Sequence, residues 1–148
     1  MRQTKEIGFS IRTISSDVMI QKDTVKEYGK SIEGLIGVEQ FFNTAGDRTA
    51  TFIASYKKTY NEDPPSSVAF MANMYSQVYL VKEAIEKYGM NTEKIRDSWY
   101  ALRDWKGALG SLTFDDKGDR VSPFAIKRIE KGAVVDVEVY QPQANGGI

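Results

Sequence analysis

The chemistry open to this chain is limited by two residue types that it lacks. It contains no cysteine and no histidine, which excludes disulfide frameworks, thiolate nucleophiles, Cys/His zinc sites and histidine-dependent catalytic triads. An enzyme would have to work with carboxylates, Lys, Tyr or Ser, and no pair of acidic residues has the spacing expected of a general acid and base. We therefore expect a protein that is not an enzyme, has no catalytic residues and needs no cofactor or metal.

The acidic cluster that most resembles a metal site is better explained as a turn. Three aspartates surround Gly118, namely Asp115, Asp116 and Asp119. Their spacing departs from the Asp-x-Asp-x-Asp-Gly pattern of an EF-hand loop, and no Glu follows at the distance that calcium coordination needs. Because Asp and Gly favour turns, we predict a tight turn here and no metal site.

The first forty residues have the pattern of a parallel α/β sheet. Apolar and polar residues alternate over 9–14, a polar helix is predicted over 21–28, and a second apolar strand over 32–38. Gly34 and Gly37 in the second strand are expected to allow close backbone approach. This strand–helix–strand order is typical of parallel sheets, in which ligands bind at the carboxyl ends of the strands.

Ser16 and Asp17 follow the first predicted strand, in the position where a ligand would bind. Each residue also has an ordinary structural interpretation. Asp17 is a favoured cap for the helix expected to begin near Ile20, and Ser16 is a residue type that shapes turns. For each residue, the sequence alone leaves both the ligand-binding and the structural interpretation open.

The best-defined predicted element is a helix over 64–89, because its apolar residues recur at helical spacing. Ser66 or Ser67 is expected to cap its start and Gly89 to end it. The spacing predicts one long buried face, formed by Met71, Met74, Tyr75, Val78, Val81, Ile85 and Tyr88. Phe70 adds apolar surface on another side of the helix.

The rest of the chain predicts further helices followed by antiparallel strands. A connector over 41–48 leads to two more helices, over 49–60 and 91–102. Strands are predicted over 107–114, 121–129 and 133–140, and Lys131-Gly132 is a hairpin signal between the last two. The predicted fold class is α/β, with a βαβ piece, three helices and a C-terminal β meander.

The charge pattern excludes several classes of partner. Lys and Arg balance Asp and Glu at 20 each, and no basic block is present. Nucleic acid and anionic membranes require clustered positive charge, so neither is expected as a partner. No apolar run is long enough to span a bilayer, and the first residues lack the apolar stretch of a secretory signal.

Several short motifs occur in a specific order and spacing along the chain. They are RQTKEIGF, a strand ending at Ser16-Asp17, SIEGLIGV, the helix pattern Tyr75-Ser76-x-Val78-Tyr79-Leu80-x-x-Glu83-Ala84-Ile85-Glu86, the stretch Gly107-Ala108-Leu109-Gly110, and the turn Thr113-Phe114-Asp115-x-x-Gly118-Asp119. Their combination resembles the C-terminal portion of type I periplasmic substrate-binding proteins, the branched-chain amino acid receptors of ABC transporters. The similarity covers residues 2–139, which is nearly the whole chain.

This resemblance implies a fragment of a protein with two lobes, joined by three crossovers, that holds a ligand in the cleft between them. Residues 1–40 would form the end of the second lobe, 41–104 a crossover and helices of the first lobe, 105–140 returning β strands, and 141–148 a flexible tail. The N-terminal portion of the family fold, which supplies most of the first lobe and the groups that hold a ligand carboxylate, is missing.

The resemblance also implies ligand-binding roles for three residues. Asp17 matches the acidic residue that binds the ligand ammonium group, where a partly desolvated carboxylate can accept charge-assisted hydrogen bonds. Phe70 matches an aromatic residue at the cleft edge that would provide an apolar wall or a cation–π face. The alternative for Phe70 is an ordinary core position. Ser16 is a third candidate, as a hydrogen-bond donor to the ligand.

The function implied is the solute-binding component of an ABC transporter, which binds an amino acid or similar small molecule. Its other partner would be an ABC permease in the membrane, and its location would be periplasmic or extracellular. One alternative is a cytoplasmic regulator that senses amides or amino acids with the same fold. Another is an association module without ligand binding of its own, which forms a homodimer through unpaired sheet edges.

Overall fold

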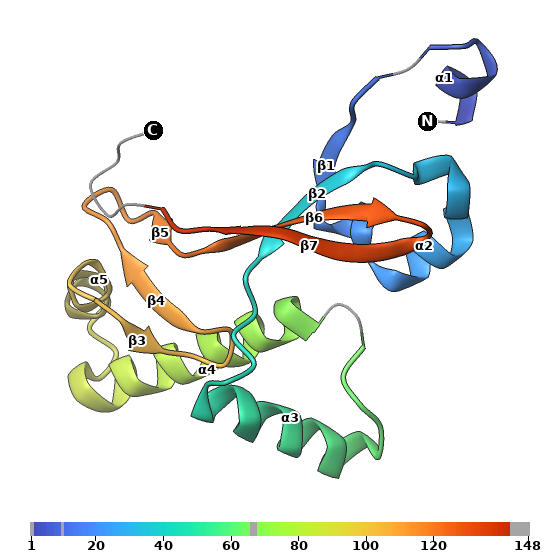
Figure 1. Ribbon diagram of the computed structural model, residues 1–148. Coiled ribbons are helices and arrows are strands. Elements are labelled where there is room, and N and C mark those ends of the chain that lie inside the picture. The colour runs from blue at the N-terminus through green and yellow to red at the C-terminus, as the bar shows by residue number, and fades with distance from the viewer. Residues whose placement is uncertain (1, 10, 66–67, 143–148) are drawn as a thin grey trace. The chain divides into compact units, whose positions relative to one another are not determined.

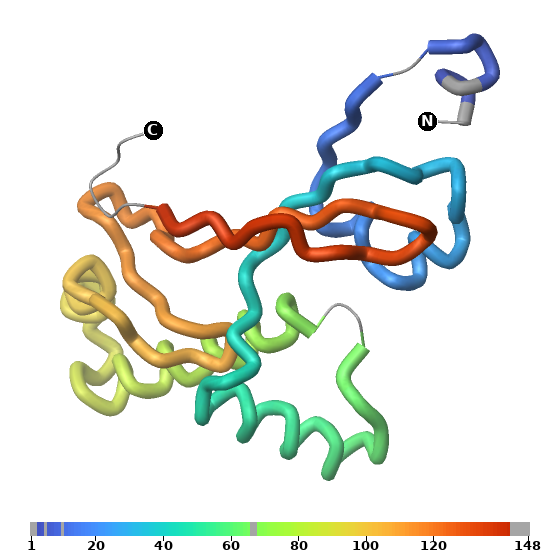
Figure 2. Tube along the Cα trace, viewed as in Figure 1, coloured from blue at the N-terminus to red at the C-terminus, as the bar shows by residue number. Residues whose placement is uncertain are grey.

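The computed structural model describes residues 2–9, 11–65 and 68–142. Two compact units are present, unit 1 with residues 1–40 and 123–140, and unit 2 with residues 41–122 and 141–148. Figure 2 follows the chain from unit 1 into unit 2 and back to unit 1. The predicted helix cap at Ser66 or Ser67 and most of the predicted tail over 141–148 lie outside the described residues.

Unit 1 is built on a sheet of four strands in the order β1-β2-β6-β7 (Figure 1). The strands are β1 (Ile14–Ser16), β2 (Ile36–Gln40), β6 (Phe124–Glu130) and β7 (Ala133–Tyr140). β1 and β2 are parallel, with Ile14 opposite Ile36, whereas β6 is antiparallel to both β2 and β7. The predicted parallel strand–helix–strand unit and the C-terminal hairpin are therefore confirmed.

Short helical segments precede and connect the parallel strands of unit 1. α1 (Arg2–Glu6) lies before β1, and the 3-10 turn η1 (Asp17–Ile20), the helix α2 (Lys22–Tyr28) and the 3-10 turn η2 (Gly29–Ile32) lie between β1 and β2. The buried core of the unit contains Ile20, Val25, Ile32, Leu35 and Ile129. Gly37 in β2 makes this packing possible, because a Cβ atom at that position would lie 2.4 Å from Ile20 Cγ2. The predicted close approach is therefore confirmed at Gly37 and wrong at Gly34, which precedes β2 and where a Cβ atom would meet nothing within 4 Å.

Both parallel strands begin later than the alternation of their residues predicts. The strands predicted over 9–14 and 32–38 begin instead at Ile14 and Ile36. A hydrogen bond from Ile36 N to the Thr13 carbonyl (3.0 Å) opens the pairing. The residues before Thr13 alternate like a strand, but no other strand in the described chain pairs with them. Alternation identifies residues suited to a strand, whereas cross-strand pairs stabilise it.

Unit 2 contains three helices and a small sheet within the described residues. The helices are α3 (Asp47–Tyr60), α4 (Val68–Tyr88) and α5 (Thr92–Tyr100), and the sheet has the order β3 (Trp105–Lys106), β4 (Ser111–Phe114), β5 (Arg120–Val121). Gly89 follows α4 with a φ of 63°, and Asn91 caps α5 by accepting a hydrogen bond from Lys94 N (3.0 Å). The three predicted helices are confirmed. No described helix has the length and apolar character needed to cross a membrane.

The single strand predicted over 121–129 is in fact two strands that belong to different sheets. β5 ends at Val121 in unit 2, and β6 begins at Phe124 in unit 1. Pro123 lies between them, and proline has no N–H group to donate to a sheet. The prediction was wrong because it gave the apolar pattern more weight than the proline. The strand predicted over 107–114 is also shorter, since β4 begins at Ser111.

The predicted acidic turn is confirmed. The Asp115 carboxylate accepts hydrogen bonds from the backbone N–H groups of Lys117 (2.9 Å) and Asp119 (2.8 Å). Gly118 has a φ of 86°, a conformation that favours glycine. Asp115 thus uses its carboxylate to shape the turn. The described part of the chain contains no group of acidic side chains arranged to hold a metal ion.

The buried face of α4 differs from the predicted one. The buried residues are mostly small: Ala72, Ser76, Leu80 and Ala84. Four residues of the predicted face are exposed instead, namely Met74, Val78, Val81 and Ile85. Small residues face the interior because the chain at Gly107 packs closely on them, and a Cβ atom on Gly107 would lie 2.8 Å from Ser76 Oγ. The prediction was wrong because it treated larger apolar residues as the better candidates for burial.

Candidate functional site

Asp17 lies at the carboxyl end of β1, where the sequence predicts a ligand. It is the first residue of η1, and its side chain is half-buried. Its backbone carbonyl accepts a hydrogen bond from Gln21 Nε2 (3.3 Å), but its carboxylate has no hydrogen bond or ion pair with any described residue. The cap of the next helix, α2, is Gln21. The alternative in which Asp17 caps a helix is therefore wrong, and its carboxylate is accessible to a cationic ligand.

Ser16 precedes Asp17 as the last residue of β1, and its side chain is exposed. It occupies the cap position of η1, but its hydroxyl makes no capping hydrogen bond. The Ser16 hydroxyl thus contributes nothing to the turn by hydrogen bonding among the described residues. Ser16 and Asp17 are successive residues, so the end of β1 carries a hydroxyl donor and a carboxylate acceptor one after the other in the chain.

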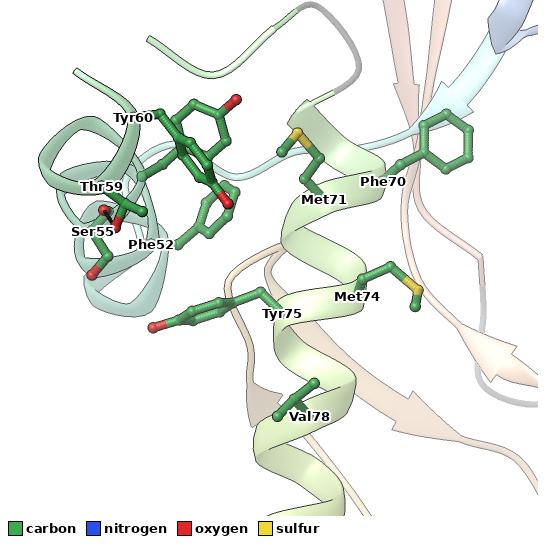
Figure 3. A pocket seen from close by; sticks show the side chains of 10 residues that line it. Phe52, Ser55, Thr59, Tyr60, Phe70, Met71, Met74, Tyr75 and Val78 are labelled. Atoms are coloured by element: carbon green, nitrogen blue, oxygen red, sulfur yellow. Dashed lines mark hydrogen bonds between the residues drawn. The ribbon is translucent and has the colours of Figure 1, made fainter. Parts of the chain in front are cut away.

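Phe70 belongs to unit 2, in the first turn of α4. Its side chain is 46% exposed in the described chain. In Figure 3, Phe70 and Met74 lie on one side of α4, while Met71 and Tyr75 lie on the side that faces α3. Ser16 and Asp17 are together in unit 1, whereas Phe70 is in the other unit.

An open groove of about 560 Å³ between α3 and α4 was not predicted from the sequence. Its aromatic lining is in mutual contact, with ring centroids 5.2 Å apart for Phe52 and Tyr75 and 4.6 Å apart for Tyr56 and Tyr60 (Figure 3). The available signal was the spacing of four residues between Phe52, Tyr56 and Tyr60, which places all three on one side of α3.

The tyrosines of this groove keep it uncharged. Tyr75 Oη donates a hydrogen bond to Tyr79 Oη at 3.2 Å. This hydrogen bond, together with burial, raises the pKa of Tyr75 above its usual value of 10. Burial also raises the pKa of Tyr56. The residues that line the groove include no charged side chain, so it suits an apolar or neutral occupant better than an ion.

A charged cluster joins α3, α4 and β3 in unit 2. Arg48 Nη2 lies 2.6 Å from Glu83 Oε1, and Trp105 Nε1 donates to Glu83 Oε2 at 2.7 Å. The Arg48 guanidinium also stacks over the Trp105 ring at 4.7 Å. Partial burial acts to raise the pKa of Glu83, but the hydrogen bonds from Arg48 and Trp105 outweigh it and lower that pKa. The carboxylate is engaged within the fold, which makes this cluster structural.

Comparison with solved structures identifies the fold. The mixed α/β unit and the mostly helical second unit together match part of a type I periplasmic-binding-protein fold. The family model described as periplasmic binding protein matches residues 1–133. The chain therefore belongs to the periplasmic binding protein family, a family of binding proteins, and the resemblance noted in its motifs is confirmed.

Solved structures show the same fold. A leucine-binding protein from Thermotoga maritima is 24% identical, with a TM-score of 0.74, over 95% of this chain and 40% of that chain. A branched-chain amino acid transporter substrate-binding protein from Streptococcus pneumoniae, in complex with isoleucine, is 23% identical, with a TM-score of 0.68 and the same coverage. This chain thus spans about 40% of the length of these related structures. No match was found among curated proteins.

Proposed function

We propose that this chain is part of the solute-binding component of an ABC transporter and that it takes part in binding an amino acid outside the cytoplasm. The observation that carries the proposal is the Asp17 carboxylate, which lies at the carboxyl end of a parallel strand without a partner among the described residues. Family membership and the ligands named for two related structures, isoleucine and leucine, support the choice of an amino acid.

Each candidate residue would bind a different part of the ligand. Asp17 would accept hydrogen bonds from the ligand ammonium group, and Ser16 would add a hydroxyl beside it. Phe70 would contact the apolar side chain of the ligand or its cation. The ligand carboxylate would be held by the part of the family fold that this chain does not span. Ligand binding would favour a closed form of the two lobes through differential affinity, and an ABC permease would receive the ligand.

Isothermal titration of leucine and isoleucine tests this function in a receptor that includes the whole fold. The receptor is one polypeptide that joins this chain to the part of the Thermotoga maritima leucine-binding protein outside the 40% matched. Asp17→Asn should weaken binding by about 2–5 kcal/mol, because the ligand ammonium would lose its buried ionic partner. Asp23→Asn is the matched control, since Asp23 is exposed in α2 and makes no ion pair in the described chain.

The outcomes separate the site from the function. Binding that Asp17→Asn leaves unchanged would remove Asp17 from the site. A folded receptor that binds neither amino acid, nor any other amino acid tested, would refute the proposed function. Phe70→Ala should cost about 1–3 kcal/mol of affinity through lost apolar contact. A substitution that lowers the melting temperature of the receptor without changing its affinity would instead make Phe70 a core residue.

An association module is the second candidate, because the sheet of unit 1 has two edge strands. β1 and β7 each pair with one neighbour among the described residues. Ile14 in β1 and Val137 in β7 are 69% and 51% exposed. Unpaired edges can add a strand from another chain. Light scattering of the purified chain distinguishes this alternative, which requires a stable dimer.

A further inference from the structure

Side chains at the start of α2 hold the backbone around Asp17. The N–H of Gln21, which follows η1, reaches the Val18 carbonyl at 3.5 Å, whereas an ordinary N–H···O hydrogen bond is about 2.7–3.2 Å long. Thr24 Oγ1 donates to the same carbonyl at 2.9 Å, and Gln21 Nε2 donates to the Asp17 carbonyl at 3.3 Å. The two peptide groups that follow the Asp17 Cα atom are thus each hydrogen-bonded to a side chain.

The two ends of η1 are fixed in other ways. Ser16, just before η1, is the last residue of β1, which pairs with β2. Ile20, the last residue of η1, is 4% exposed in the core of unit 1 and packs closely on Gly37. Between these anchors, Asp17 is half-buried and Val18 is 59% exposed. Packing holds these two residues less firmly, so their conformation depends on the hydrogen bonds of their carbonyl groups.

The direction of the Asp17 carboxylate follows from this backbone. An aspartate side chain is short, with two torsion angles that occupy a few preferred rotamers, so its carboxylate moves with the Cα atom that carries it. The Asp17 carboxylate makes no hydrogen bond or ion pair within the described chain, so no other described side chain orients it. A binding group is effective when the surrounding structure holds it within about 0.5 Å of the productive geometry.

We propose that Thr24 is a positioning residue for ligand binding, whose hydroxyl fixes the Val18 carbonyl and thereby holds Asp17 in the direction that receives the ligand ammonium group. Gln21 assists by holding the Asp17 carbonyl. This inference rests on the proposed function, because it takes Asp17 as the partner of the ligand. It assigns neither Thr24 nor Gln21 a contact with the ligand, since both act through the backbone of η1.

Removal and restoration of the hydroxyl test the proposal, by isothermal titration of leucine into the receptor that joins this chain to the Thermotoga maritima polypeptide. Thr24→Val keeps the shape of the side chain and removes the donor, so it should weaken leucine binding about three- to tenfold, the effect of one lost hydrogen bond. Thr24→Ser keeps the donor and should bind leucine to within about twofold of the unmodified receptor.

The matched control is Thr51→Val in α3. Thr51 Oγ1 also donates to a backbone carbonyl, that of Asp47, at 2.9 Å, but it belongs to unit 2. This variant loses an equivalent hydrogen bond and should leave leucine affinity unchanged. Comparison with Thr24→Val therefore separates the effect on the site from the loss of a hydroxyl in general.

Coupling to Asp17 distinguishes positioning from a merely structural role. In a receptor that carries Asp17→Asn, the ionic partner is absent, so Thr24→Val should weaken binding by less than about twofold. Four results would overturn the assignment of Thr24. They are an unchanged affinity in Thr24→Val, no restoration by Thr24→Ser, an equal loss in Thr51→Val, and an equal effect of Thr24→Val with and without Asp17→Asn.

NMR relaxation of this chain without ligand tests the positioning apart from the function. The backbone order parameters of Val18 and Met19 should fall in Thr24→Val and stay unchanged in Thr51→Val. If they fall while the unmodified receptor binds no amino acid, the function is refuted and the role of Thr24 in holding the turn stands. Order parameters that Thr24→Val leaves unchanged would refute that role, whatever the receptor binds.

Discussion

Ser76→Ala should destabilise unit 2 well beyond the usual effect of removing one hydroxyl. Ser76 is 7% exposed in the middle of α4. Its Oγ donates to the Ala72 carbonyl at 2.7 Å and accepts from the Ala108 N–H at 2.8 Å. Ala108 is fully buried, and its carbonyl accepts a hydrogen bond from Thr49 Oγ1 at 2.7 Å. Side chains of α3 and α4 thus hydrogen-bond to the carbonyl and the N–H of Ala108, respectively.

The size of this destabilisation follows from the Ala108 N–H group, which the substitution leaves without its acceptor. Without the Ser76 hydroxyl, the Ala108 N–H is buried with no acceptor, which costs about 1–3 kcal/mol. Alanine is a better helix former than serine by about 0.5 kcal/mol, which offsets part of this cost. We expect a net loss of about 0.5–2.5 kcal/mol in the free energy of unfolding.

Urea denaturation followed by tryptophan fluorescence measures this loss in the right unit. The chain has two tryptophans, Trp99 and Trp105, and both belong to unit 2. Ser98→Ala is the matched control, because Ser98 Oγ also donates to a carbonyl of its own helix, that of Ile95, at 2.6 Å but accepts no hydrogen bond from a backbone N–H. The reasoning is refuted if Ser76→Ala costs no more than Ser98→Ala.

Two further substitutions test the packing of unit 1 and the charged cluster of unit 2. Gly37→Ala should destabilise unit 1 by about 1–3 kcal/mol, because the new Cβ atom would lie 2.4 Å from the buried Ile20 side chain; thermal melts by circular dichroism measure it, and an unchanged melt contradicts the close approach. The pKa of Glu83 is lowered from a usual value of 4.5. Its contribution to stability is therefore present above about pH 4.5 and is lost as the pH falls through the lowered folded-state value. Urea melts from pH 6 to pH 3 should show a smaller loss of unfolding free energy for Glu83→Gln than for the unmodified chain. An equal dependence of the unfolding free energy on pH in the two proteins would contradict the lowered pKa of Glu83.

The sequence predicted where helices and strands occur along the chain better than which strands pair with each other. The end of α4 was predicted because glycine readily adopts the positive φ that ends many helices, and Gly89 has a φ of 63°. The split at Pro123 was missed, since the pattern of apolar residues continues through it and does not show which sheet each half joins. Pairing partners depend on contacts between residues far apart in the chain, which local alternation does not contain.

In the candidate site too, positions that depend on local sequence were predicted, whereas contacts between distant residues were not. The position of Asp17 at the end of a parallel strand follows from local order, and the structure reproduces it. Whether its carboxylate would be engaged by the fold was not predictable. The Arg48–Glu83–Trp105 cluster was missed because its three residues come from α3, α4 and β3, which are far apart in the sequence. Sequence spacing within one helix gives no sign of such a contact.

The wrong prediction for α4 shows what helical spacing leaves undecided. The helix is apolar on two sides, and the spacing alone does not say which side packs inside unit 2. The chain at Gly107 approaches so closely that a Cβ atom there would lie 2.8 Å from Ser76 Oγ, and Met71 and Tyr75 pack against the same core cluster. Met74, one turn away from the packed side, stays exposed in the described chain. The buried face of the helix is therefore decided by a close approach between segments far apart in the sequence, which the order of residues along the helix does not contain.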